Sequence, residues 1–129
     1  MTPPIVLVAD DCRTLRVIVR RYLDALGFQT IVVANAIDAY QEALIRRFDL
    51  IILDLQMPDK DGQDLILEIA RDCELNSQTP HLFITAEGPA SLSSRGLNED
   101  FLIQKPIEEQ VFCSRVRKAL NHETEHYAC

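Results

Sequence analysis

Short apolar runs alternate along the chain with longer stretches that carry apolar residues at helical spacing. The short runs, rich in Val, Ile and Leu, predict strands at residues 5–9, 30–33, 50–53, 80–85 and 100–103. The longer stretches predict helices at residues 12–26, 35–46, 62–73, 90–97 and 107–120. Strands that are apolar throughout, each followed by a helix, are typical of a parallel sheet covered on both faces. The pattern therefore predicts an α/β fold, a doubly wound (βα)5 domain with a five-stranded parallel sheet.

Length and composition limit what else the chain can be. Its 129 residues suit one domain over 1–129, with a core at about 5–121 and a polar tail, 122–129, that we expect to fray. The net charge of −7 argues against a nucleic-acid surface. No stretch approaches the roughly 20 apolar residues of a membrane span, and the N-terminus lacks the basic region of a signal peptide.

The four cysteines show no metal-binding spacing, so we expect free thiols in a reducing cytosol and a cytoplasmic protein. They are Cys12, Cys73, Cys113 and Cys129, the last of which we expect to be exposed. The three histidines, His81, His122 and His126, are isolated from one another, which is typical of surface or structural residues rather than metal ligands.

Polar and charged residues follow four of the five predicted strands. Asp10 and Asp11 end the first strand, Asp54 the third, Thr85 the fourth and Lys105 the fifth. Ligands of an open parallel sheet bind at the carboxyl ends of its strands. Any one of these residues could be a helix cap or a loop charge, but their coincidence at strand ends indicates a site.

The chemistry of this set favours phosphoryl transfer. Three clustered carboxylates repel one another and attract a cation, and all-oxygen ligands suit Mg²⁺ better than zinc. With Mg²⁺ and Lys105 neutralising the oxygens of a transferring phosphoryl group, Asp54 could attack in line. Thr85 could then donate a hydrogen bond to the product. The neighbouring Asp59 and Asp61 we interpret as solvated charges of a loop or helix start.

Four motifs, VLVADD, LDLQMPDKDG, FITAE and QKPI, together closely resemble the receiver domains of two-component response regulators, including chemotaxis regulators. Their order and approximate spacing agree with that family, and the resemblance covers residues 5–121. It implies a flavodoxin-like fold with strand order 2-1-3-4-5.

The resemblance also implies a role for each matching residue. Asp54 would be the phosphorylated aspartate, and Asp10 and Asp11 would organise Mg²⁺, for which Mn²⁺ could substitute. Asp11, Asp54 and the backbone carbonyl of Gln56 would be the direct metal ligands. Thr85 would be the switch hydroxyl, and Lys105 would bind the phosphoryl group and form a cis bond with Pro106. Gln56 and Glu87, together with Pro106, would border the site.

The resemblance implies partners as well. A histidine kinase or histidine phosphotransfer protein would dock near the first helix and the loop after the fifth strand. Phosphorylation would shift the surface made by the fourth helix, fifth strand and fifth helix, and so control binding of an unidentified effector protein. We expect a monomer or a phosphorylation-dependent dimer that binds neither nucleic acid nor membrane. A stand-alone regulator is favoured over a piece of a longer chain.

One departure concerns the aromatic residue that the family usually carries three positions before the lysine. That position is Leu102, whereas Phe101 stands four before. Either Leu102 takes the switch position without an aromatic ring, which we favour, or a bulge brings Phe101 there. The predicted fourth helix, GPASLSSRGL, is also short and poor in helix-forming residues.

Two alternatives to a phosphoryl-accepting switch stay open. The first is a phosphohydrolase with an Asp nucleophile, but the second Asp of such enzymes is replaced here by Gln56, so the general acid is missing. The second is a receiver-like interaction module that works without phosphorylation, against which the complete acid, hydroxyl and lysine set argues. We therefore expect a phosphoacceptor that assists its own chemistry and not a turnover enzyme.

Overall fold

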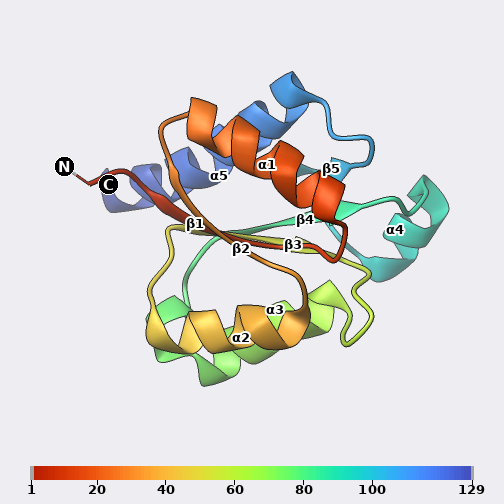
Figure 1. Ribbon diagram of the computed structural model, residues 1–129, viewed down its shortest axis with the longest axis horizontal. Helices are drawn as coiled ribbons and strands as arrows, with labels where there is room; N and C mark the ends of the chain where they lie inside the picture. The colour runs from red at the N-terminus through yellow and green to blue at the C-terminus, as the bar shows by residue number, and fades with distance from the viewer. Residues whose placement is uncertain (1, 129) are drawn as a thin grey trace.

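A computed structural model describes the backbone of residues 2–128 and the side chains of residues 2–121. Its sheet contains five parallel strands in the order β2-β1-β3-β4-β5 (Figure 1). They are β1 (Ile5–Ala9), β2 (Gln29–Val33), β3 (Leu50–Asp54), β4 (His81–Thr85) and β5 (Leu102–Gln104). The predicted fold class and strand order are confirmed.

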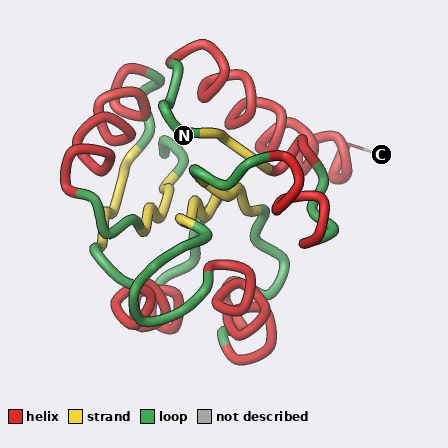
Figure 2. The backbone as a smooth tube through the Cα atoms, turned by 90° about the vertical axis from the view of Figure 1, so that its right-hand side faces the viewer, coloured by secondary structure: helices red, strands yellow, loops and turns green. Residues whose placement is uncertain are grey.

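Helices flank the sheet on both sides (Figures 1 and 2). They are α1 (Arg13–Ala25), α2 (Ala36–Ile45), α3 (Gly62–Asp72), α4 (Pro89–Arg95) and α5 (Glu109–Ala128), with two 3-10 turns, η1 (Glu74–Asn76) and η2 (Glu99–Phe101). Helices α1 and α5 cover one face and α2 and α3 the other, whereas α4 stands at the end of the sheet (Figure 1). No helix in the described part of the chain is long and apolar enough to span a membrane.

The two faces of the sheet have separate apolar cores. Alternate strand residues such as Val8 and Ile52 pack toward α1 and α5, and their neighbours such as Leu7 and Leu53 pack toward α2 and α3. All five residues of β3 are buried because this strand is central and covered on both sides. A buried central strand holds its last residue, Asp54, in a fixed position.

Two predicted boundaries were wrong. The segment predicted as a fifth strand from residue 100 starts with η2, because the Asn98 side chain accepts a hydrogen bond from the Asp100 amide and so closes a turn. Helix α5 runs past its predicted end at residue 120 to Ala128, since residues 121–128 contain neither glycine nor proline to stop it. The side chains of His122 and His126, and the whole of Cys129, lie outside the described residues.

Candidate functional site

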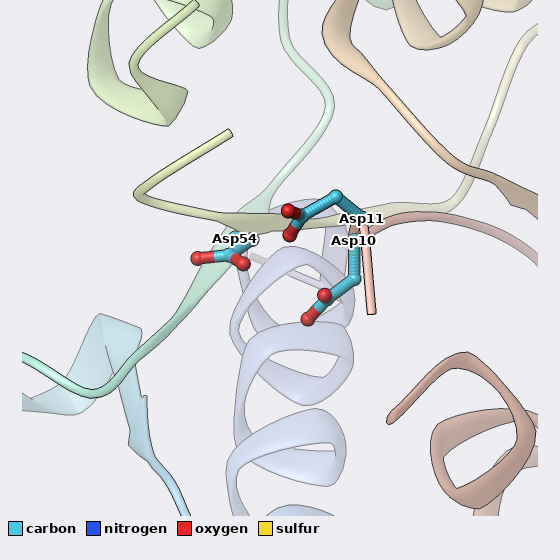
Figure 3. Close-up of side chains that lie close together, drawn as sticks. All are labelled: Asp10, Asp11 and Asp54. Carbon is cyan, nitrogen blue, oxygen red and sulfur yellow. The ribbon is translucent and has the colours of Figure 1, made fainter. Parts of the chain in front are cut away.

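Three carboxylates meet at the carboxyl ends of β1 and β3. Asp54 is the last residue of β3, and Asp10 and Asp11 directly follow β1. One oxygen from each lies within 4.8 Å of the others, and Figure 3 shows the three side chains together. Asp10 is 0% and Asp54 3% exposed, whereas Asp11 is open to solvent. The strand ends therefore bring together the three acids that the sequence singled out.

Lys105 approaches these acids from β5. Its Nζ lies 3.1 Å from Oδ2 of Asp54 and 3.7 Å from Oδ2 of Asp10. Its backbone amide donates to the Thr85 carbonyl at 2.8 Å, which continues the pairing of β4 with β5. Burial lowers the pKa of Lys105, but the charges of Asp10 and Asp54 outweigh burial and hold it above its usual value. The ammonium is therefore charged and poised against the acids.

Asp10 is the most confined of the three acids. Its Oδ1 accepts a hydrogen bond from the Cys12 amide at 2.8 Å, whereas its buried Oδ2 has no hydrogen-bond partner among the described residues. Burial raises the pKa of Asp10, and the charge of Asp54 adds to this, against the opposing effect of the Cys12 hydrogen bond. A buried carboxylate oxygen without a hydrogen bond is costly unless a cation is close to it, and the Lys105 ammonium at 3.7 Å is too far away to donate one.

These features fit a hard divalent cation. The group offers carboxylate oxygens and no sulfur or imidazole, which is the donor set that Mg²⁺ prefers. Asp11 is exposed, so water could complete the coordination. Gln56, whose carbonyl the resemblance assigns to the metal, follows two residues after Asp54, and its amide donates to Asp54 Oδ1 at 2.9 Å. The residues present therefore fit Mg²⁺.

Gly62 packs directly on the Asp54 backbone. A Cβ at this position would lie 2.4 Å from the Asp54 carbonyl oxygen, closer than real Cβ contacts come. The Gly62 amide also donates to the Leu55 carbonyl at 2.8 Å. The sequence suggested only that Gly62 begins a helix, but the structure requires glycine because α3 starts against the strand that carries Asp54.

Thr85 ends β4 and is fully buried. Its Oγ1 accepts a hydrogen bond from the Glu87 amide at 2.9 Å. The Glu87 carboxylate pairs with Arg95, whose Nε donates to Oε1 at 2.9 Å, and it also accepts a hydrogen bond from the Ser91 hydroxyl. These contacts engage the carboxylate away from the three acids. Pro106 is exposed, and the Lys105–Pro106 bond is cis, as the resemblance implied.

Leu102 rather than Phe101 takes the strand position before the lysine. Residues 102–104 pair with 83–85 without a bulge, and Leu102 pairs with Phe83 and belongs to the buried core on that face of the sheet. Phe101 belongs to η2, is 41% exposed and stacks on His81 with ring centroids 5.7 Å apart. The arrangement is the one that the sequence favoured, with no aromatic ring at the strand position.

Asp59 is an exposed loop charge and Asp61 stands at a helix start, as the sequence indicated, but each also makes contacts that the sequence did not indicate. Asp59 accepts hydrogen bonds from the amides of Ala36 and Ile37, at 3.1 and 3.0 Å, and so caps α2 from another loop. Burial raises the pKa of Asp59, but these backbone donors outweigh it and hold the pKa below its usual value.

Asp61 caps α3 and also pairs with Arg95. Its Oδ1 accepts from the Gln63 amide at 2.9 Å, and its Oδ2 lies 2.8 Å from Arg95 Nη2. Burial raises the pKa of Asp61, but the hydrogen bond from Arg95 outweighs it and the pKa lies below its usual value. An Asp before an apolar helix is a local capping signal that could have revealed the first contact. No local pattern reveals Arg95, which stands 34 residues away.

A doubly wound parallel sheet with an acid cluster, a hydroxyl and a lysine at one edge defines a flavodoxin-like receiver fold. Residues 6–117 match the family model described as response regulator receiver domain. The chain therefore belongs to the response regulator receiver family. Protein PetR of Rhodobacter capsulatus is 32% identical over 123 residues, which cover 92% of this chain and 49% of that protein. The chain spans only 8 to 49% of the length of curated relatives that it matches.

Solved structures show the same fold. A CheY-like receiver domain protein from Methanospirillum hungatei has a TM-score of 0.83 at 18% identity, covering 96% of this chain and 98% of that one. The receiver domain of a sensor histidine kinase from Pseudomonas aeruginosa, with magnesium coordinated in its active-site cleft, has a TM-score of 0.81 at 20% identity, covering 92% and 98%.

Proposed function

We propose that the protein is a phosphoryl-accepting switch in which Asp54 takes a phosphoryl group from a phosphohistidine donor. The observation that carries this is the position of the Asp54 carboxylate, 3.1 Å from the Lys105 ammonium and within 4.8 Å of Asp10 and Asp11. A nucleophile between a cationic group and a candidate cation site is the arrangement that in-line phosphoryl transfer needs.

The transfer itself exchanges one bond for another. An Asp54 oxygen bonds to phosphorus as the bond between phosphorus and the donor imidazole breaks, which leaves an aspartyl phosphate and a free histidine. Lys105 holds an equatorial oxygen of the phosphoryl group. Asp10, Asp11, Asp54 and the Gln56 carbonyl would hold Mg²⁺, which supplies positive charge against the developing negative charge.

Phosphorylation would then act on Thr85. Its hydroxyl oxygen accepts from the Glu87 amide at 2.9 Å, which leaves the O–H free to donate, and a phosphoryl group adds strong acceptor oxygens nearby. Donation from Thr85 to one of them would move the loop between β4 and α4 and, with it, the surface made by α4, β5 and α5. An effector protein, or a second copy of the chain, that prefers this arrangement would be recruited.

The donor is proposed to be a histidine kinase or histidine phosphotransfer protein that docks at α1. Helix α1 begins at Arg13, two residues after Asp11, and its Val17 is 51% exposed. Three arginines are exposed beside it on the same helix, Arg13, Arg20 and Arg21. Although the chain as a whole is acidic, this part of α1 presents an apolar residue among cations. Such a surface suits a partner with an acidic surface.

The acceptor is proposed to act once per phosphorylation rather than as a turnover phosphohydrolase. Gln56 stands where an Asp-nucleophile hydrolase has its general acid, and its side chain is exposed. An amide cannot donate and reclaim the proton that repeated hydrolysis needs.

Intact-protein mass spectrometry tests this function. Incubation with acetyl phosphate and MgCl₂ should add one phosphoryl group, and addition of a chelator before the donor should prevent it. Asp54→Asn should stay unmodified, while Asp64→Asn, an exposed acid on α3, should react like wild type. Absence of any added group in wild type, or its retention in Asp54→Asn, would overturn the proposal.

A further inference from the structure

Helix α4 is held to the rest of the protein by one buried apolar side chain, Leu92, and by the polar contacts of its last residue, Arg95. Within residues 89–95, all of which the structure describes, only Leu92 is buried. The helix has seven residues, three of them serine, so its intrinsic stability is low. Arg95, at its C-terminal end, has a side chain that is only 19% exposed. A sheltered arginine at the end of a weak helix points to a role in fixing that helix.

Arg95 binds two loops at once. Its Nη2 and Nη1 lie 2.8 and 3.1 Å from the two oxygens of Asp61, a bidentate pair, and Nη1 also donates to Gln63 Oε1 at 3.0 Å. On its other side, Nε donates to Glu87 Oε1 at 2.9 Å and Nη2 lies 2.8 Å from Glu87 Oε2. The guanidinium therefore neutralises two carboxylates that would otherwise repel each other.

Both loops border the phosphoacceptor. Asp61 pairs in an isolated β-bridge with Gln56, two residues after Asp54, and Gly62 next to it packs on the Asp54 carbonyl. Glu87 is two residues after Thr85, and its amide donates to the Thr85 hydroxyl. Glu87 thus contacts Thr85 through its backbone and Arg95 through its side chain. Movement of Thr85 toward Asp54 would therefore pull on a loop whose Glu87 side chain the guanidinium holds.

We propose that Arg95 is a positioning residue that clamps Asp61 and Glu87 and so holds Thr85 and α4 in the unphosphorylated arrangement. This inference rests on the proposed function, because it concerns the switch that phosphorylation of Asp54 would operate. The clamp stabilises the arrangement that does not bind a phosphoryl mimic well. The apparent affinity for such a mimic is the intrinsic affinity multiplied by the fraction of protein in the other, binding-competent arrangement. Loss of the clamp therefore makes phosphoryl mimics bind more tightly.

The test compares Arg95→Met with wild type in two measurements. The first is amide hydrogen exchange of residues 86–95 without ligand, which should be about tenfold or more faster in the variant because α4 opens locally. The second is the apparent affinity for beryllofluoride with Mg²⁺, followed by NMR, which should rise by roughly fivefold or more. Arg71→Met removes an exposed arginine of α3 and should match wild type in both.

Two further variants guard against a general loss of structure. Arg95→Lys keeps the charge but not the bidentate geometry, so it should lie between wild type and Arg95→Met in both measurements. Glu87→Gln keeps the shape of the side chain but removes one carboxylate from the clamp, so it should shift both measurements in the direction of Arg95→Met.

The outcomes separate failure of the clamp from failure of the function. If wild type binds beryllofluoride and Arg95→Met binds it equally or more weakly, the clamp is overturned and the function stands. If wild type does not bind beryllofluoride at all, the proposed function fails and the coupling fails with it. Unchanged hydrogen exchange in Arg95→Met would show that the guanidinium does not hold α4, and would also overturn the inference.

Discussion

Lys105 Nζ lies 3.1 Å from the Asp54 carboxylate and 3.7 Å from that of Asp10, so one ammonium serves two acids from different strands. Asp10 directly follows β1, Asp54 ends β3 and Lys105 directly follows β5, and the parallel sheet brings the three together. The charges of Asp10, Asp54 and Lys105 therefore act on one another, and a substitution at one of these residues changes how strongly the others bind a cation or an anion.

Replacement of Lys105 by methionine should separate metal binding from phosphoryl transfer. Removal of the cation leaves the acids more negative, so Mg²⁺ should bind roughly fivefold or more tightly. Phosphorylation by acetyl phosphate should slow by roughly a hundredfold, because the group that meets the phosphoryl oxygens is lost. Isothermal titration calorimetry and intact mass measure the two effects. Lys118→Met, an exposed lysine on α5, is the control and should change neither. Weaker Mg²⁺ binding in Lys105→Met would contradict this assignment.

Asp10→Asn should stabilise the protein while removing its response to Mg²⁺. The asparagine keeps an oxygen for the Cys12 amide but removes a buried charge that Asp54 repels. We expect the free energy of unfolding in the absence of metal to rise by about 1 kcal/mol. Addition of Mg²⁺ should raise the melting temperature of wild type but not of the variant. Asp24→Asn, exposed at the end of α1, changes the net charge equally and should keep the response to Mg²⁺. A variant less stable than wild type without metal would show that the Asp10 charge is not costly.

Gly62→Ala should damage the site through the backbone. Its Cβ would meet the Asp54 carbonyl oxygen at 2.4 Å, so α3 or β3 must shift. Overpacking of this kind lowers the free energy of unfolding by about 1–3 kcal/mol, and phosphorylation of Asp54 should slow as well. Gly88→Ala adds a Cβ with nothing within 4 Å and should stay within about 0.5 kcal/mol of wild type, as urea unfolding would measure. Equal stability of the two variants would mean that the close approach is not real.

Asp59 should stabilise the protein in a pH-dependent way. At neutral pH, Asp59→Ala should lower the free energy of unfolding by about 1 kcal/mol, because two amides of α2 lose their acceptor. The folded pKa of Asp59 lies below its unfolded value, so this stabilisation is fully present above the unfolded pKa and disappears as pH falls through the folded pKa. The difference between wild type and variant should therefore stay constant from about pH 7 to about pH 4 and narrow below it. A difference that stays constant down to about pH 2 would show that the charge of Asp59 plays no part in the cap.

The strands and the site residues at their ends were predictable because each depends on a local signal combined with one rule of topology. Apolar runs mark the buried strands, and parallel order then brings Asp10, Asp54 and Lys105 to one edge. The sequence predicted that the fifth strand starts at residue 100, two residues before β5 starts, because phenylalanine is common in strands. In the structure, Phe101 belongs to the turn that Asn98 caps.

Contacts between loops could not be predicted in this way. Asp59 reaches α2 across 22 to 23 residues, and Arg95 reaches Asp61 across 34. Nothing in the local sequence indicates which loops meet, because that depends on where helices α2, α3 and α4 pack against the sheet.

The most direct measurement is to locate the phosphoryl group on the chain. After reaction with acetyl phosphate and Mg²⁺, borohydride reduces an aspartyl phosphate to homoserine, and peptide mass spectrometry then identifies the modified position. The expected result is homoserine at Asp54 and at no other acid, with none when Mg²⁺ is withheld. Homoserine at Asp10 or Asp11 instead, or unmodified Asp54 in a protein that carries a phosphoryl group, would contradict the assignment of Asp54 as the acceptor.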